Sequence, residues 1–272
     1  MRNLFIILTL MLPLCSYAQF TGLKYINLEP ATKVVTYTLK YQPDSTNPDD
    51  IRNSKLLLFI GPNISKIVNK AGYINDTTIR KFTTDAQVIN FLTDPKTFHG
   101  SILYQIFKNY PKGKLTYTDH IPSDSYRFEE NLDLFQWKLT GDTATVSGFK
   151  SQRATCDFGG RNWIAWFSPD LPYSDGPYKF NGLPGLIVKV FDTRNHYVFE
   201  LLVVNKLEPA VMIDIQDKQY INTTKQGFFK AWDSFRADIV SRMKQAGGDN
   251  DVQQTIARNM KSDNNPIELK RK

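Results

Sequence analysis

The chain has 272 residues, of which 13% are aromatic, and it carries a formal net charge of +7. A chain of this length can bury a substantial core, as one large β-rich domain or as two closely joined ones. The excess of positive charge does not indicate nucleic-acid binding, because it is spread along the chain and the only local basic run is Lys270-Arg271-Lys272. We expect this run to be a solvated tail, with weak attraction to anionic envelope surfaces as the alternative.

The first 18 residues predict a signal peptide. An apolar run over residues 4–14 precedes Ser16-Tyr17-Ala18, whose small residues suit signal peptidase. We therefore expect cleavage before Gln19, export to the periplasm or the extracellular space, and a single domain over residues 19–272. A lipidated Cys15 is the alternative, but lipoprotein processing requires a small residue where Leu14 stands. No other run of the sequence is long and apolar enough to predict a transmembrane helix.

Alternating apolar and polar residues predict strands through the first half of the chain. Val35, Tyr37, Leu39 and Tyr41 alternate with polar side chains, as in a strand with one buried face. Further strands are predicted at residues 55–60, 64–68, 101–108, 114–118, 126–128, 135–139 and 143–147. Residues 69–84 are polar and predict irregular structure, whereas residues 85–92 predict one or two helical turns. Short connections between the strands favour an antiparallel meander.

Two glycines, Gly159 and Gly160, separate strands predicted at residues 153–158 and 163–167, and this spacing predicts a hairpin. Alternation along the second strand sends Trp163 toward the core and leaves Trp166 at or near a surface. Residues 168–182 contain three prolines and two glycines. They predict a long, ordered crossover loop.

The loop ends in the segment Gly182-Leu183-Pro184-Gly185-Leu186-Ile187. Pro184 supplies the fixed φ, and Gly185 the positive φ, of a type II turn. We expect this turn to be a structural joint, because it offers few polar groups to a ligand. The apolar and β-branched residues that follow predict a strand at residues 186–191 and a returning strand at residues 197–204.

This six-residue motif and the residues before it resemble the GLPGLI family of secreted Bacteroidota proteins, which is named after the motif. The resemblance rests on Gly159-Gly160-Arg161, Trp163, Ala165-Trp166-Phe167, Asp170-Leu171-Pro172 and the run from Gly176 to Gly182, in that order. Weaker similarity extends from Val34 to the closing Asn265-Pro266-Ile267-Glu268-Leu269. The resemblance implies a secreted protein but no biochemical function.

The C-terminal part of the chain changes to helical periodicity. Phe228, Trp232, Phe235, Ile239 and Met243 recur at spacings of three and four, which predicts an amphipathic helix over residues 225–245. A short second helix is predicted after Asn250. The predicted fold is therefore α+β and mainly β: a curved, half-barrel-like antiparallel sheet of eight to eleven strands, covered by the C-terminal helix. Its architecture resembles that of half-barrel carriers of lipoproteins.

The sequence contains no established metal-binding or catalytic motif. His99, His120 and His196 lie apart, and the lone Cys156 is predicted to be a small half-buried hydrophobic side chain on a strand, with a reactive thiol as the alternative. We therefore predict no catalytic residues, no metal and no cofactor. Asp170 and Asp175 are either loop-capping residues or a spatial pair of carboxylates.

Five residues on or beside the crossover loop combine a guanidinium group with aromatic faces, which suits contact with a protein, peptide or glycan. These candidate binding residues are Arg161, Trp166, Tyr173, Tyr178 and Phe180. The alternative is that they stack on one another to hold the loop in place. We therefore predict a non-enzymatic envelope protein that binds a partner protein or an apolar, lipid-like ligand on the concave face of the sheet. A hydrolase of envelope polymers using Asp170 or Asp175, and a purely structural role without a pocket, are the alternatives.

Overall fold

The computed structural model describes residues 22–97, 102–122, 124–245, 251, 254 and 262–270. The predicted signal peptide and nearly all of the predicted second C-terminal helix lie outside these residues. Within them, no helix has the length and apolar character required to cross a membrane.

The described residues form one open sheet of twelve strands in the order β12-β6-β5-β4-β3-β2-β1-β11-β10-β9-β8-β7. The strands are β1 (Tyr25–Tyr41), β2 (Arg52–Ile60), β3 (Ser65–Asn69), β4 (Gln105–Lys108), β5 (Lys114–Ile121), β6 (Asp124–Asn131), β7 (Lys138–Val146), β8 (Phe149–Phe158), β9 (Arg161–Ser168), β10 (Leu186–Asp192), β11 (Tyr197–Gln216) and β12 (Ile221–Asn222). Neighbouring strands are antiparallel except β12, which pairs parallel with β6 and makes the sheet mixed. The predicted mainly-β fold is confirmed, with one strand more than the predicted maximum.

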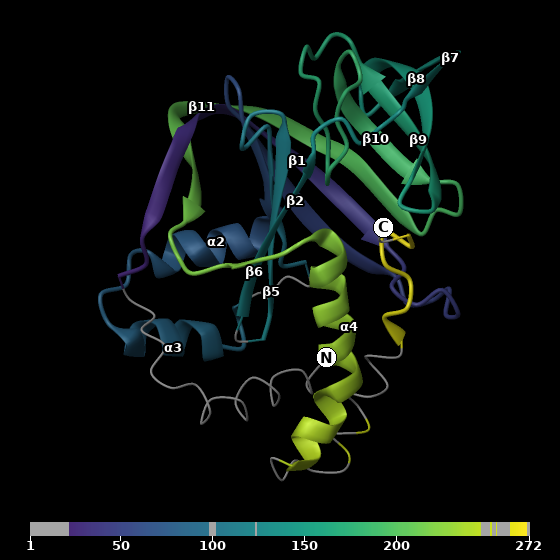
Figure 1. Ribbon diagram of the computed structural model, residues 1–272. Helices are drawn as coiled ribbons and strands as arrows, with labels where there is room; N and C mark the ends of the chain where they lie inside the picture. The colour runs from purple at the N-terminus through teal and green to yellow at the C-terminus, as the bar shows by residue number, and fades with distance from the viewer. Residues whose placement is uncertain are drawn as a thin grey trace.

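The long strands β1 and β11 run through the middle of the sheet and pair over most of their length (Figure 1). Their pairing shifts register at three places, and such bulges bend and twist a sheet. The bend gives the sheet a concave face.

Both faces of β2 are covered, and this explains its continuous run of apolar residues. Leu56 and Leu58 belong to the main core on the concave face, whereas Leu57 and Phe59 belong to a second core on the opposite face. The helix α2 (Lys70–Ile79) covers the second core, where Tyr73 packs against Phe59 with ring centroids 4.9 Å apart.

The prediction of irregular structure over residues 69–84 is wrong, because α2 occupies most of this stretch. The Asn69 side chain caps the helix by accepting hydrogen bonds from the backbone N–H groups of Ala71 and Gly72. Gly72 and two threonines give the segment weak helix propensity, so tertiary packing and this cap decide its structure. The predicted helical turns that follow are confirmed as α3 (Asp85–Thr93), which begins with a capping box between Thr84 and Gln87.

The predicted C-terminal helix is confirmed as α4 (Lys225–Gln245). Phe228 is buried and packs against three aromatic rings of β5 and β6, Tyr117, Tyr126 and Phe128. Ile239 is also buried. The side chain of Met243, the last predicted member of the stripe, lies outside the described residues.

Candidate functional site

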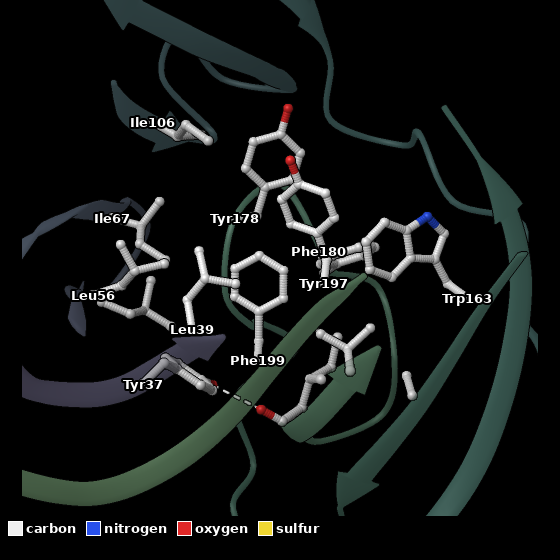
Figure 2. Close-up of a cluster of buried hydrophobic side chains, with 14 of the residues drawn as sticks. Tyr37, Leu39, Leu56, Ile67, Ile106, Trp163, Tyr178, Phe180, Tyr197 and Phe199 are labelled. Atoms are coloured by element: carbon white, nitrogen blue, oxygen red, sulfur yellow. Dashed lines mark hydrogen bonds between the residues drawn. The ribbon is translucent and has the colours of Figure 1, made fainter. Parts of the chain in front are cut away.

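The crossover loop predicted at residues 168–182 is confirmed as the connection between β9 and β10, residues 169–185, which we call the central loop and which folds onto the concave face of the sheet. Tyr178 and Phe180 have exposed fractions of only 1% and 0%. Figure 2 shows Phe180 between Trp163 and Phe199, and its ring centroid lies 4.7 Å from that of Trp163. The concave face is therefore filled here by the protein's own aromatic side chains, and the ligand site that we predicted on it is occupied.

The motif at the end of the central loop joins it to β10. Leu183, Leu186 and Ile187 are buried, and the Tyr37 hydroxyl donates a 2.8 Å hydrogen bond to the backbone oxygen of Ile187. The motif is thus built into the core, in agreement with the expected structural joint.

The predicted type II turn is wrong. The N–H of Gly185 donates to the carbonyl of Leu183 at 2.8 Å, a three-residue turn, whereas the N–H of Leu186 donates to Leu171. Gly185 does have a positive φ, of 150°. A Cβ atom at this position would lie 2.2 Å from the carbonyl oxygen of Ser168, so the backbone of β9 approaches too closely for any other residue.

Arg161 lies inside the protein, with an exposed fraction of 4%. Its guanidinium donates to Asp192 Oδ2 at 3.0 Å, to Asn265 Oδ1 at 2.6 Å and to the backbone oxygen of Ile267 at 3.0 Å. Asp192 belongs to the neighbouring strand β10, whereas Asn265 and Ile267 belong to residues 264–270, which we call the closing segment. Arg161 therefore anchors the closing segment and is not a surface group.

A buried charge cluster joins the central loop to the closing segment. Lys179 is fully buried, and its Nζ donates to Glu130 and to Glu268 Oε1. Lys225, at the start of α4, contacts both of these carboxylates. Burial acts to raise the pKa of Glu268, but Lys179 and Lys225 together with a hydrogen bond from Tyr178 outweigh it and hold the pKa below its ordinary value. Every member has a partner inside the protein, so the cluster links the central loop, β6, α4 and the closing segment.

The one sequence signal for this cluster is the position of Lys179 between two aromatic residues of the loop, Tyr178 and Phe180. The remaining two candidate residues reach solvent. Trp166 is half-buried on β9, and half-buried Tyr173 lies on the central loop with Lys33 Nζ 5.6 Å above its ring. The structure therefore does not bring the five candidates together on one surface.

A polar cleft of about 970 Å³ lies beside the central loop and is lined by Tyr173, Asp175 and Lys108 among others. Lys108 Nζ donates to Asp175 Oδ1 at 2.6 Å and to the backbone oxygens of Gly176 and Phe180. Burial lowers the pKa of Lys108, and Asp175 acts against that change. All three protons of the ammonium group are engaged, so this lysine holds the loop and is not available as a nucleophile.

Asp170 and Asp175 do not form a carboxylate pair in one cleft. Asp170 is exposed and lines a separate depression beside β7 and β8, whereas Asp175 lies in the polar cleft in its ion pair with Lys108. A two-carboxylate hydrolysis requires both groups to flank one scissile bond. The arrangement does not meet this requirement.

A second, more apolar cleft of about 700 Å³ lies between α2, α3 and the ends of β1 and β2. We call it the helix cleft. Its apolar surface includes Ala71, Ile74 and Phe91, and Ile74 has an exposed fraction of 48%. Sequence reasoning missed this cleft because residues 69–84, which contain α2, were predicted to be irregular. The spacing of Thr84 and Gln87 matches the capping box that begins α3, so the sequence carries a signal for only one of the two helices that form the cleft.

Cys156 is a free thiol on β8 and is buried, not half-buried as predicted, and burial raises the pKa of its thiol to about 12. This thiol is therefore not activated as a nucleophile. In the part of the chain that the structure describes, no three histidine, cysteine or acidic side chains lie close enough together to hold a metal ion.

The fold and its clefts define an open, mixed β-sheet whose concave face is sealed by its own central loop and closing segment. Residues 160–189 match the family described as "Protein of unknown function (Porph_ging)". The match covers β9, the central loop and the motif. It confirms over this segment the predicted resemblance to a Bacteroidota-associated family of unknown function.

Among solved structures, the chain is similar to PNGF-II. For the crystal form in space group P21 the TM-score is 0.50 at 14% identity, over 74% of this chain and 33% of PNGF-II. The form in space group C2 gives a TM-score of 0.46 at 14% identity, over 71% and 31% of the two chains. This chain thus spans about a third of the length of PNGF-II. At such identity the likeness to the P21 form concerns the fold alone. No curated protein matches the chain.

Proposed function

We propose that this protein is a non-catalytic binding protein of the cell envelope that holds an apolar ligand in the helix cleft. The observation that carries the proposal is the cleft itself, whose volume of about 700 Å³ falls within the range of small-molecule sites, roughly 300–1,000 Å³. Export by the predicted signal peptide would place the protein in the periplasm or outside the cell, where apolar molecules need a carrier to cross water.

The side chains of the helix cleft support binding of apolar surface. Ile74 presents almost half of its surface to solvent, and Phe91 contributes an aromatic face. Covering such apolar groups stabilises a complex by about 25 cal/mol for each Å² removed from water. The proposal therefore keeps the predicted apolar ligand and moves its site from the concave face to the opposite side of the sheet, beside α2 and α3.

The alternatives receive less support from the geometry. The carboxylates of Asp170 and Asp175 line different depressions, which does not favour a hydrolase built on them. A purely structural role would not require a cleft with an exposed apolar residue in its wall.

The proposal is tested by titrating the protein, from Gln19 onward, into N-phenyl-1-naphthylamine, an uncharged dye whose fluorescence rises in apolar surroundings. We expect saturable binding by the wild type and at least tenfold weaker binding by Ile74→Glu. Ile89→Glu is the matched control, because Ile89 is an isoleucine of α3 with a similar exposed fraction, 39%, that does not line the cleft. Absence of saturable binding by the folded wild type, or equal losses in the two variants, would contradict the proposal.

A further inference from the structure

The charged side chains of the helix cleft are unbalanced. Lys55, Lys70 and Lys96 line it together with a single carboxylate, Asp94, so its charge is 3 − 1 = +2. Asp94 Oδ1 moreover accepts a hydrogen bond from the backbone N–H of Lys96 at 2.8 Å, which turns part of this carboxylate toward the main chain. We infer that the ligand of the helix cleft is a single-chain amphiphile with an anionic head group. This inference rests on the proposed function.

The topology gathers the three lysines at one end of the cleft. Lys70 begins α2, and Lys96 follows the last residue of α3 by three positions. The two helices are joined by the short connection 80–84 and run antiparallel, as neighbouring helices with short connections do. The start of α2 and the end of α3 therefore lie at the same end of the cleft. β2 pairs with β3 so that Leu56 lies opposite Asn69, and Lys55 therefore lies next to the start of α2.

The apolar residues extend away from this charged end. Ile74 and Thr78 lie one and two turns further along α2 than Lys70, on the same side of the helix, because residues four apart share a face. The cleft thus combines a basic end with an apolar wall. This is the pattern that an anionic head group and one acyl or alkyl chain would complement.

The three lysines also differ from the buried lysines of this protein. Lys66, Lys108 and Lys179 each form an ion pair with an internal carboxylate. Among the described residues, no carboxylate forms an ion pair with Lys55, Lys70 or Lys96. Their ammonium groups are therefore available to an anion that enters the cleft, and an anion there would gain charge-assisted hydrogen bonds.

The experiment measures displacement of N-phenyl-1-naphthylamine by dodecanoate and by 1-dodecanol at pH 8 and low ionic strength. The two compounds have the same chain and differ in head-group charge. We expect the wild type to bind dodecanoate at least about tenfold more tightly than dodecanol, and this preference to shrink as salt is added. The triple variant Lys55→Gln, Lys70→Gln, Lys96→Gln should lose the preference while keeping its affinity for the dye and for dodecanol.

A second triple variant, Lys24→Gln, Lys112→Gln, Lys138→Gln, removes the same charge from exposed lysines outside the cleft and should keep the preference. The inference is overturned if the wild type binds dodecanol as tightly as dodecanoate, or if the cleft variant keeps its preference for the anion. Equal loss in both triple variants also overturns it, because net charge would then be the cause. In each of these three cases the wild type still binds the dye, so the inference about the head group fails while the proposed function stands. If the folded wild type does not bind the dye, the proposed function fails, and the inference fails with it.

Discussion

Lys179 of the central loop and Glu268 of the closing segment form an ion pair at 2.6 Å across 89 residues of sequence. The side chain of Lys179 is fully buried, and that of Glu268 has an exposed fraction of 2%. A charge taken out of water to this extent persists only with a partner of opposite sign. The pair therefore ties the closing segment to the central loop on the concave face, where Glu130 is the second carboxylate partner of Lys179.

Replacing Glu268 with Ala should lower the free energy of unfolding by about 3 kcal/mol, because it leaves Lys179 buried with Glu130 as its remaining carboxylate partner. Urea unfolding followed by tryptophan fluorescence measures the change. Glu208→Ala is the control, since Glu208 pairs with Lys206 on the surface, where such a pair contributes about 0–1 kcal/mol. Similar losses in the two variants would refute a special role for the buried pair.

Arg161→Lys should detach the closing segment even though it preserves the charge. A lysine cannot reach Asp192, Asn265 and Ile267 at once, because only the planar guanidinium has donors spread over three nitrogen atoms. We expect the backbone amides of residues 264, 265 and 267–269 to exchange with deuterium at least tenfold faster, and the free energy of unfolding to fall by about 2 kcal/mol or more. Arg153→Lys, at a partly exposed pair with Asp142, should leave exchange in the closing segment unchanged.

Gly185→Ala should destabilise the protein by about 3 kcal/mol or more, because its Cβ would overlap the backbone of Ser168. Gly182→Ala in the same motif is the comparison. Gly182 also has a positive φ, of 89°, but the nearest atom to an added Cβ is 3.9 Å away, so only the backbone conformation is penalised, by about 1–2 kcal/mol. Thermal unfolding of both variants measures the difference. Equal costs would mean that backbone conformation alone selects glycine at residue 185.

The stability of the protein should fall between about pH 4 and pH 6 in a manner that depends on Asp119. Burial raises the pKa of this carboxyl to about 6, although it accepts hydrogen bonds from the backbone of His120 and from Tyr117. A carboxyl of the unfolded chain titrates near pH 3.9. Between these values the folded state binds more protons, so the free energy of unfolding falls as pH rises.

Asp119→Asn should remove this dependence and make the protein more stable than the wild type at pH 7, by about 1–2 kcal/mol, because the amide carries no charge to desolvate. The two proteins should be similar at pH 4. Urea unfolding at several pH values measures the effect, and Asp170→Asn at an exposed position is the control. A stability difference between wild type and Asp119→Asn that does not grow with pH would contradict the assignment.

Sequence by itself determined most of the strands, the hairpin at Gly159 and Gly160, and the full extent of α4. Each of these rests on a local signal, namely alternation with period two, a pair of turn residues, or apolar side chains three and four apart. Such signals predict Trp163 inside and Trp166 near the surface, because the two faces of a strand are fixed by its pleat.

Only the tertiary structure decided the roles of the residues in the central loop. A loop has no period, so nothing local separates Phe180, which is fully buried, from Tyr173, which reaches solvent. The same holds for Lys179, whose charge is compatible with the core because Glu130 of β6 and Glu268 from the end of the chain both pair with it. Likewise α2 depends on its cap and on the packing of Tyr73 against Phe59, and the helix cleft exists only where α2 and α3 meet the sheet. These features arise from contacts between distant segments, and the sequence pattern of either segment alone does not contain them.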